Sequence, residues 1–366
     1  MSRLASQQRP SASLFSQQWQ VQLADYVTVI AFSPDGQHLA TSSAAGDIWL
    51  GHPREGLHLL QASQGRSVDA IAFSANSQFL AAAGQGGNLW IWDIVTSDIP
   101  ASHMTKNLGK GWIDCLAWHP TESVLAIATG SHVQLWQMTT CKMLAELDFE
   151  RSSVLDLAWH PQGTHLAVGG QGGVSVWTAA DWRTPPEFTP VPGASIAVQW
   201  SAAGRYLASG NLDHTLMVVD WGNPPPWYMQ GFPGKVRQVV WSDLLTKMDA
   251  PLLAATCMDA ITIWQREAKE SGVWRNRVLQ EHEGRVEVIA FQPNSFNLLS
   301  AGADGALRLW PKAKTNSQIL SASEVGWGAI AWSPDGQQLV GGDRTGLLTA
   351  WGQSQRGHGF QSKRSE

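Results

Sequence analysis

The sequence predicts an all-β fold in which antiparallel strands recur along the whole chain, and three observations lead to this class. Among 366 residues there are 35 glycines and 20 tryptophans, while only 15% are charged, a composition typical of short buried strands joined by tight turns. Apolar and polar residues alternate with a period of two. Nearly the same ten residues occur near both ends, as AFSPDGQHLA over 31–40 and AWSPDGQQLV over 331–340.

The repeat can be measured from an aromatic residue that ends the first strand of each unit. Consecutive aromatic residues are 41, 45, 41, 41, 41, 50 and 41 residues apart, and such a regular period indicates a repeat architecture. These eight anchors are Phe32, Phe73, Trp118, Trp159, Trp200, Trp241, Phe291 and Trp332.

The pattern within a unit predicts four strands. The second unit has VDAIAF over 68–73, QFLAAAG over 78–84 and NLWIWD over 88–93, with turn residues between them. In every unit but the eighth a weaker fourth strand follows, as in CKMLAEL over 141–147. Four antiparallel strands form a blade, and blades in series close into a propeller. The eight anchors therefore predict an eight-bladed β-propeller.

The units resemble WD-repeat β-propellers over about residues 18–352, and the SPDGQ turns resemble those of bacterial members. The WD dipeptide itself occurs at Trp92–Asp93, whereas Gly51 and Val219 stand where the third strand should end in tryptophan. Six units do end this strand in tryptophan, namely at Trp92, Trp136, Trp177, Trp264, Trp310 and Trp351.

The resemblance implies a polar network and a way to close the ring. In the family a histidine, a serine and an aspartate tie each blade to its tryptophan. Only the seventh unit matches in full, with His282, Ser300, Asp304 and Trp310, so we expect most blades to depend on apolar packing. The eighth unit supplies three strands, and Gln18–Ala24 is expected to complete it as the fourth, leaving no open edge.

These boundaries predict one propeller domain over 18–353, with a flexible tail at 1–17 and a flexible basic tail at 354–366. The N-terminal 19 residues lack a continuous apolar core, and no run of 18 apolar residues occurs. We therefore expect neither a secretory signal nor a membrane span, and a cytoplasmic location. The cysteines at 115, 141 and 257 have no paired spacing, which disfavours a disulfide framework or a zinc knuckle.

Charge bears on the class of partner. The chain has a net charge of −5, and removing the two basic ends, each +2, leaves −9 on residues 10–354. A body this acidic repels phosphate, so we predict that the partners are proteins and not nucleic acid. We expect a monomeric propeller within a larger complex.

Four charged residues are expected at the mouth of the central channel, each four positions before an anchor: Asp69, Asp114, Arg237 and Glu287. They could hold a cation or a basic peptide, or form a solvated rim. Because acids and histidines do not recur in register, we predict no catalytic residue, no metal and no cofactor. The alternative is a metal-handling protein or a hydrolase that uses these acids or the repeated WHP turns at His119 and His160.

Long connections distinguish units four to six. They span 178–193, 221–234, 242–251 and 265–277, and all join first to second or third to fourth strands, which places them on one face, here called the bottom face. Loops on a rigid scaffold often carry function, and aromatic and arginine residues are typical of binding hot spots. The candidate partner-binding residues are Trp182, Arg183, Trp227, Tyr228, Phe232, Trp274 and Arg275.

The aromatic residues of these connections could instead cover the outer strands of their own blades. With both readings open, the sequence predicts a non-catalytic scaffold that docks partner proteins on the propeller faces, with the bottom face of units four to six favoured.

Overall fold

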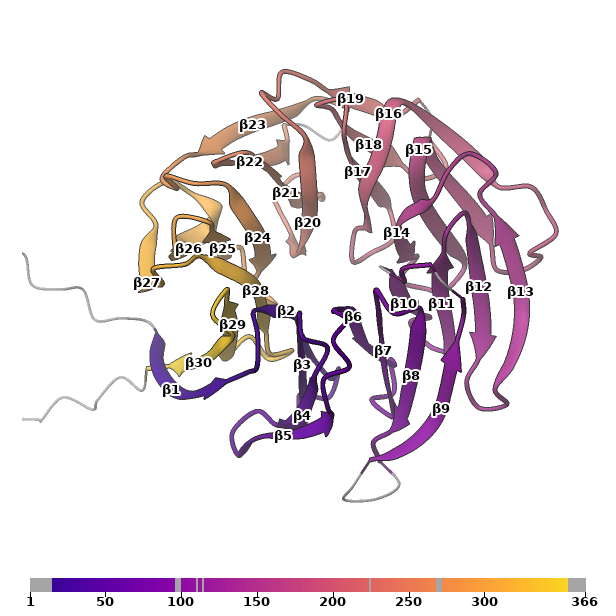
Figure 1. Cartoon of the computed structure of the whole chain (residues 1–366). Coiled ribbons are helices and arrows are strands. Elements are labelled where there is room, and N and C mark those ends of the chain that lie inside the picture. The colour runs from indigo at the N-terminus through magenta and orange to yellow at the C-terminus, as the bar shows by residue number, and fades with distance from the viewer. Residues whose placement is uncertain are drawn as a thin grey trace, which may run out of the picture.

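A computed structural model describes residues 15–95, 100–109, 111–113, 115–223, 225–267 and 272–354. Over these residues the chain forms thirty strands and one short 3₁₀ helix, η1 (Pro311–Ala313). The strands are arranged as a ring, with the first strand of each unit nearest the centre and the fourth at the outside (Figure 1).

Six sheets have four antiparallel strands, and one has six. The first sheet holds β2 (Val27–Phe32), β3 (Leu39–Ser43), β4 (Ile48–His52) and β5 (Gly56–Gln61). The second holds β6 (Val68–Phe73), β7 (Phe79–Gly84), β8 (Asn88–Asp93) and β9 (Ala101–Asn107). The third holds β10 (Leu116–Trp118), β11 (Val124–Thr129), β12 (His132–Gln137) and β13 (Lys142–Asp148).

The six-stranded sheet follows, with β14 (Val154–Trp159), β15 (His165–Thr178), β16 (Glu187–Trp200), β17 (Tyr206–Asn211), β18 (Leu216–Asp220) and β19 (Trp227–Met229). The next holds β20 (Val236–Leu245), β21 (Pro251–Cys257), β22 (Ala260–Arg266) and β23 (Trp274–Leu279). The sixth holds β24 (Val286–Phe291), β25 (Leu298–Gly302), β26 (Ala306–Trp310) and β27 (Gln318–Ala322). The last holds β28 (Trp327–Trp332), β29 (Gln338–Asp343), β30 (Leu347–Gln353) and β1 (Phe15–Gln22).

The prediction of eight blades is wrong: counted by sheets, the ring is a seven-bladed propeller, because the fourth and fifth sequence units share the six-stranded sheet. The segments GGQGG over 169–173 and PG at 192–193 have residue types common in turns, but they lie inside the continuous strands β15 and β16. Gly169 and Gly170 allow this course, since a Cβ on Gly169 would approach a Val198 methyl to 2.6 Å. Gly172 and Gly173 bend the strand with φ of 84° and 147°, so the chain continues without a separate hairpin.

A buried carboxylate also joins the two units of this sheet. Asp156 of β14 accepts hydrogen bonds from the backbone N–H of Val198 in β16 at 2.6 Å and from that of Leu157 at 2.9 Å. Enclosure of the carboxyl group raises the pKa of Asp156 to about 6, although these two hydrogen bonds favour the ionised form.

Closure by an N-terminal strand is confirmed. β1 pairs antiparallel with β30, from Phe15 opposite Gln353 to Gln22 opposite Leu347, and the two strands lie side by side in Figure 1. The strand begins at Phe15, three residues before the expected Gln18. The rest of the tails predicted at 1–17 and 354–366 lies almost wholly outside the described residues.

The core consists of the contacts between neighbouring blades. Second strands are the most deeply enclosed, and every residue of β7, with the sequence FLAAAG, is buried. Alanine and glycine suit this position because the faces of two adjacent sheets approach each other there. First strands of consecutive units are in contact around the ring, including β28 with β2 across the closing seam.

In the seventh unit the four residues of the family network form one chain of hydrogen bonds. The indole N–H of Trp310 donates to Ser300 Oγ at 2.7 Å, and Ser300 lies 2.7 Å from His282 Nε2. His282 Nδ1 lies 3.0 Å from the Asp304 carboxylate. Burial lowers the pKa of His282 more strongly than Asp304 raises it, which favours the neutral imidazole that this chain of donors and acceptors requires.

Four of the anchor tryptophans, Trp118, Trp159, Trp200 and Trp241, are hydrogen-bonded to the unit before their own. The indole N–H of Trp159 donates to the backbone carbonyl of Ala117 at 3.0 Å, and Trp200 and Trp241 make the same bond to Ala158 and Gln199. By contrast, the equally buried Nε1 of Trp332 has no hydrogen-bond partner among the described residues.

This contrast gives a matched pair of substitutions. We expect Trp159→Phe to lower the free energy of unfolding by about 1 kcal/mol more than Trp332→Phe, because only the first removes a hydrogen bond, that of the indole N–H to the Ala117 carbonyl. Both side chains are 8% exposed, so the loss of packing is similar. Urea unfolding of the two variants measures the difference, and equal destabilisation would contradict the role assigned to the indole N–H.

Candidate functional site

The repeated WHP turns connect consecutive units. His119 Nε2 donates to the carbonyl of Gly163, and His160 Nε2 donates to that of Gly204, both at 3.1 Å. The Nδ1 atoms accept from backbone N–H groups of their own turns, at 3.0 Å from Glu122 in the first case. Both nitrogens of each ring are therefore used, and neither imidazole offers a lone pair to a metal.

The glycines of these contacts are required by geometry. Gly163 and Gly204 have φ of 73° and 74°, and a Cβ at either would approach the facing imidazole to 2.2 Å. The turn of the fifth unit is thus held by a buried histidine of the fourth. Over the described residues, no group of three or more His, Cys, Asp or Glu side chains could hold a metal ion.

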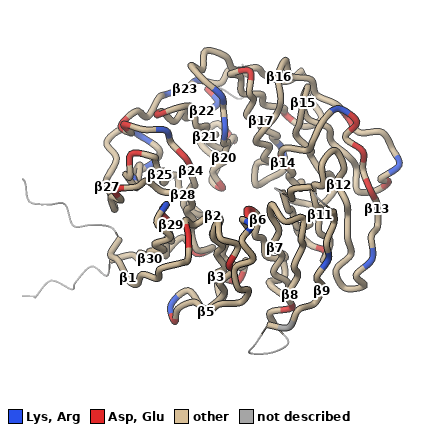
Figure 2. The backbone as a smooth tube through the Cα atoms, viewed as in Figure 1, with Lys and Arg blue, Asp and Glu red and all other residues tan. Residues whose placement is uncertain are grey.

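The expected channel residues lie where strand pairing is interrupted. Asp69, Arg237 and Glu287 each fall at a β-bulge in the first strand of their unit, while Asp114 lies outside the described residues. Glu287 is paired with Arg285 at 2.9 Å and with Arg344 at 2.7 Å. Bulged residues are left out of the hydrogen-bond ladder of their sheet. Around the whole ring, residues of both charge signs are spread over the blades (Figure 2).

Trp182 and Arg183 lie on the connection between β15 and β16. The Trp182 ring packs edge-on against the anchor Trp159, with ring centroids 5.8 Å apart, and remains partly exposed. Arg183 is exposed, and its backbone N–H is fixed by Asp181 at 3.0 Å. This part of the expected site therefore consists of an exposed arginine and a partly exposed tryptophan that packs against the buried Trp159.

A second aromatic cluster joins the fifth and sixth units. Trp274 at the start of β23 is 9% exposed and contacts Tyr206, Trp241 and Trp227, with centroids 5.6–6.1 Å apart. Trp227 is partly buried on the outer edge of this cluster. Arg266 lies over the Trp227 ring and donates from Nη1 to the Tyr206 hydroxyl at 2.7 Å. Trp274 therefore belongs to the core, and Trp227 forms its boundary with solvent.

The remaining candidate residues are not gathered at one point. Tyr228 is 42% exposed on β19, and its hydroxyl donates to the carbonyl of Pro190 at 2.7 Å. Arg275 is exposed and pairs with Glu267 at 2.6 Å. Phe232 is buried, follows β19 toward the opposite face and contacts Trp264. The structure thus gives two aromatic clusters with exposed margins, and Phe232 is a buried member of the same apolar core as Trp274.

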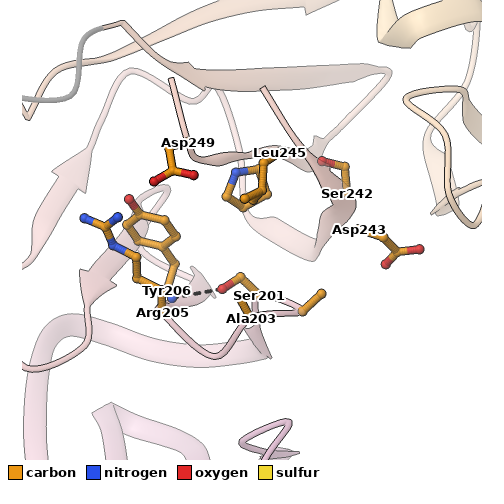
Figure 3. A pocket seen from close by; sticks show the side chains of 10 residues that line it. Ser201, Ala203, Arg205, Tyr206, Ser242, Asp243, Leu245 and Asp249 are labelled. Carbon is orange, nitrogen blue, oxygen red and sulfur yellow. Dashed lines mark hydrogen bonds between the residues drawn. The ribbon is translucent and has the colours of Figure 1, made fainter. Parts of the chain in front are cut away.

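A pocket of about 450 Å³ opens beside the second cluster, between the turn that precedes β17 and the hairpin that joins β20 to β21 (Figure 3). One wall is the short turn of the fifth unit, which carries the small, exposed Ala202 and Ala203. The other wall is the long hairpin, with Leu245 and Pro251 facing the hollow. Tyr206 lies at its base (Figure 3).

Both walls are fixed by internal hydrogen bonds. Ser201 Oγ accepts from the Tyr206 N–H at 2.9 Å, as drawn in Figure 3, and Gly204 N–H donates to the Ser201 carbonyl at 2.7 Å. On the facing hairpin, Ser242 Oγ accepts from the N–H of Leu252 and donates to the carbonyl of Leu244. The pocket is therefore preformed, which lowers the entropic cost of binding.

Three charged residues, Arg205, Asp243 and Asp249, line this pocket. Arg205 donates from Nε and Nη2 to the two carboxylate oxygens of Asp220, both at 3.0 Å. These hydrogen bonds raise the pKa of Arg205, and the buried Asp220 compensates its charge. Asp243 and Asp249 are exposed on the lining, and the negative charge of Asp249 also helps to raise the pKa of Arg205. Burial raises the pKa of Tyr206, so its hydroxyl stays neutral near pH 7.

Sequence reasoning noticed one wall of this pocket and missed the other. The insertion over 242–251 stood out by its length. The turn of the fifth unit reads SAAG where the first and eighth read SPDG, and the loss of proline and aspartate side chains was the available signal for a hollow. Nothing in the sequence shows that these two segments face each other.

Comparisons with known proteins agree with the fold. The family described as "WD domain, G-beta repeat" matches residues 18–50, 55–93, 141–178, 191–220 and 274–311. A segment of 80 residues is 39% identical to "Telomerase protein component 1" of Mus musculus, covering 21% of this chain and 3% of that protein. The chain thus spans a very small part of this relative. Over the described residues, no helix has the length and apolarity needed to cross a membrane.

Proposed function

Because this chain is a β-propeller built from WD40 repeats, we propose that it is a non-catalytic scaffold that docks partner proteins on its faces, chiefly on the bottom face of units four to six. WD40 propellers typically bind other proteins. The observation that supports the choice of face is that Arg183, Tyr228 and Arg275 are exposed and each follows in sequence a tryptophan that packs in an aromatic cluster.

Rigid support matters because an immobile aromatic or arginine anchor loses little conformational freedom when a partner binds. Tyr228 is held by its bond to Pro190, and Arg275 by its ion pair with Glu267. Trp227 contributes one partly exposed edge, whereas Trp274 and Phe232 contribute through packing. We propose the cytoplasm as the site of action. From the similarity of the SPDGQ turns we also predict that the protein is of the bacterial type.

The test is site-specific photo-cross-linking in native lysate, with a photoreactive phenylalanine analogue placed either at Tyr228 or at Tyr26. Both tyrosines are 42% exposed, and Tyr26 precedes a first strand, on the face opposite the long connections. We expect one protein to be cross-linked at position 228 and not at 26, and Arg183→Ala with Arg275→Ala to reduce its capture at least about fivefold, which corresponds to about 1 kcal/mol.

Cross-linking at position 26 alone would move the docking surface to the opposite face. Capture that is unchanged by the double arginine variant would show that these residues do not contribute. Circular dichroism of each variant verifies that the ring is intact.

A further inference from the structure

We propose that Asp156 forms a pH-dependent hydrogen-bond bridge between the fourth and fifth units, in which the protonated carboxyl group binds both the N–H and the C=O of Val198 and the ionised group binds the N–H alone. The contact between β14 and β16, here called the Asp156 joint, is then tighter in mildly acidic solution. This inference does not depend on the proposed docking of partner proteins. It is carried by the hydrogen bonds of Asp156 and by a second joint of the same ring, where an amide side chain occupies the equivalent position.

Asp156 occupies a position that carries no acid in any other unit. It lies on the first strand β14, three residues before the anchor Trp159. The residues at this position in the other seven units are Val29, Ala70, Cys115, Ala197, Gln238, Val288 and Ala329. A carboxyl group is thus a property of one joint, and the remaining joints of the ring serve as references for it.

The equivalent glutamine shows what a side chain with both a donor and an acceptor does at this position. Gln238 Oε1 accepts the backbone N–H of Ile289 at 2.7 Å, and Gln238 Nε2 donates to the carbonyl of the same residue at 3.2 Å. Ile289 and Val198 are themselves equivalent, because each lies two residues before the anchor of its unit. Gln238 therefore joins the sixth unit to the seventh by two hydrogen bonds.

The Asp156 joint has half of this arrangement when the carboxyl group is ionised. Asp156 accepts the N–H of Val198 at 2.6 Å. The N–H and C=O groups of one residue in a β-strand point to the same side, so the carbonyl of Val198 also faces β14. An ionised carboxylate can only accept hydrogen bonds, whereas a protonated one has an O–H donor. Protonation therefore supplies the donor that Nε2 provides in Gln238.

The surroundings of Asp156 are apolar. It is paired opposite Gly169, and the neighbouring Leu157 and the facing Ala197 and Val198 are buried. Burial raises the pKa of Asp156 to about 6, against the effect of the hydrogen bonds from the N–H groups of Val198 and Leu157. The carboxyl group thus changes its protonation state in mildly acidic solution.

Charged neighbours do not account for this behaviour. The strands packed against β14 are β10, β11, β15 and β16, and His165 and Glu187 are the titratable residues within the described parts of these four strands. Neither is paired near Asp156: His165 begins β15, and Glu187 is opposite Val176. The thiol of Cys115, directly before β10, donates to the Leu155 carbonyl at 3.3 Å. Burial is therefore the main influence on the Asp156 carboxyl group.

The sign of the pH effect follows from the two protonation states. The pKa of Asp156 is about 6 in the folded chain, against its ordinary value of 3.8 when the chain is unfolded, so folding takes up a proton between these pH values. The contribution to stability is fully present below about pH 4 and is lost as the pH rises through about 6. Between pH 5 and pH 7.5 this group alone should raise the equilibrium constant of unfolding about tenfold.

The test compares Asp156→Asn with the full chain in urea unfolding at pH 5 and pH 7.5. Asparagine is neutral at both pH values and offers a donor and an acceptor, as Gln238 does. We expect the ratio of the unfolding constants, full chain over variant, to rise about tenfold between the two pH values. The control is Asp25→Asn, the same change at an exposed residue, for which the ratio should stay within about twofold.

A third variant separates the bridge from the charge. Asp156→Leu is also neutral but can neither donate nor accept, so the N–H of Val198 loses its partner. Its stability relative to Asp156→Asn should not depend on pH, and its unfolding constant at pH 5 should be about tenfold higher than that of Asp156→Asn. Equal stability of the leucine and asparagine variants would show that no bridge exists.

A ratio for Asp156→Asn that is the same at both pH values would also overturn the proposal. Should this variant fail to fold, hydrogen exchange of the full chain provides the test. After correction for intrinsic rates, peptides over 154–159 and 195–200 should exchange several-fold faster at pH 7.5 than at pH 5 when referred to peptides over 236–241 and 286–291, which contain the Gln238 bridge. The same pH dependence in both joints would contradict a role for Asp156.

Discussion

Deletion of residues 1–24 is expected to lower the free energy of unfolding by about 3–6 kcal/mol. The deletion removes β1, which pairs with β30 along its length, and with it the buried side chains of Phe15 and Leu23, 5% and 3% exposed. Burying one such side chain contributes about 1.5–3 kcal/mol. Phe15 also contacts Trp332 in the last blade, with ring centroids 5.4 Å apart, so this blade loses both its edge strand and part of its core.

The control is deletion of residues 2–12, which leaves β1 complete. We expect that shorter deletion to unfold in urea at the same midpoint as the full chain, and the longer deletion to unfold at a clearly lower midpoint. The variant that lacks residues 1–24 should also self-associate, because the freed edge of β30 exposes unpaired backbone groups. If both deletions unfold like the full chain, β1 contributes nothing to closing the ring.

Replacing Trp274 by alanine is expected to cost about 3–5 kcal/mol of stability, as is usual for a large aromatic residue removed from a core. The ring is 9% exposed and contacts three other aromatic side chains. The result distinguishes between two roles for Trp274, packing in the core and docking of a partner. If the residue served only in docking, its replacement would weaken binding and leave stability nearly unchanged.

The matched control is Trp112→Ala, the same chemical change at a residue that is 60% exposed. It should alter the free energy of unfolding by less than about 0.5 kcal/mol. Thermal unfolding followed by circular dichroism measures both variants. Similar small effects for the two substitutions would show that Trp274 is not a core residue and would return it to the candidate docking surface.

Repetition made most of the fold predictable. A period near 41 residues with four strand patterns per unit requires a ring of blades, and the missing fourth strand of the last unit pointed to β1. The number of blades was not predictable in the same way. GGQGG and PG are turn signals in most contexts, but Gly169 and Gly170 serve close approach between strands, and the local sequence does not distinguish these two uses.

The candidate site was predictable as a region and not as a set of contacts. The lengths of the connections identified units four to six. Whether a tryptophan on such a connection is covered depends on the side chains that it contacts, and Trp274 packs against Tyr206 of β17 and Trp241 of β20, neither of which is a strand paired with β23. The pocket depends on the meeting of Ala203 with a hairpin about forty residues away, a distance relation that no local pattern encodes.

The pairing of β1 with β30 also has a consequence in time. Phe15 and its partner Gln353 are separated by nearly the whole chain, so during synthesis on the ribosome the first strand emerges long before the strand that it will join. Until then the backbone of β1 has no partner strand, and the last blade stays open. We expect closure to be the final and slowest step of folding, since it joins the most distant segments of the chain.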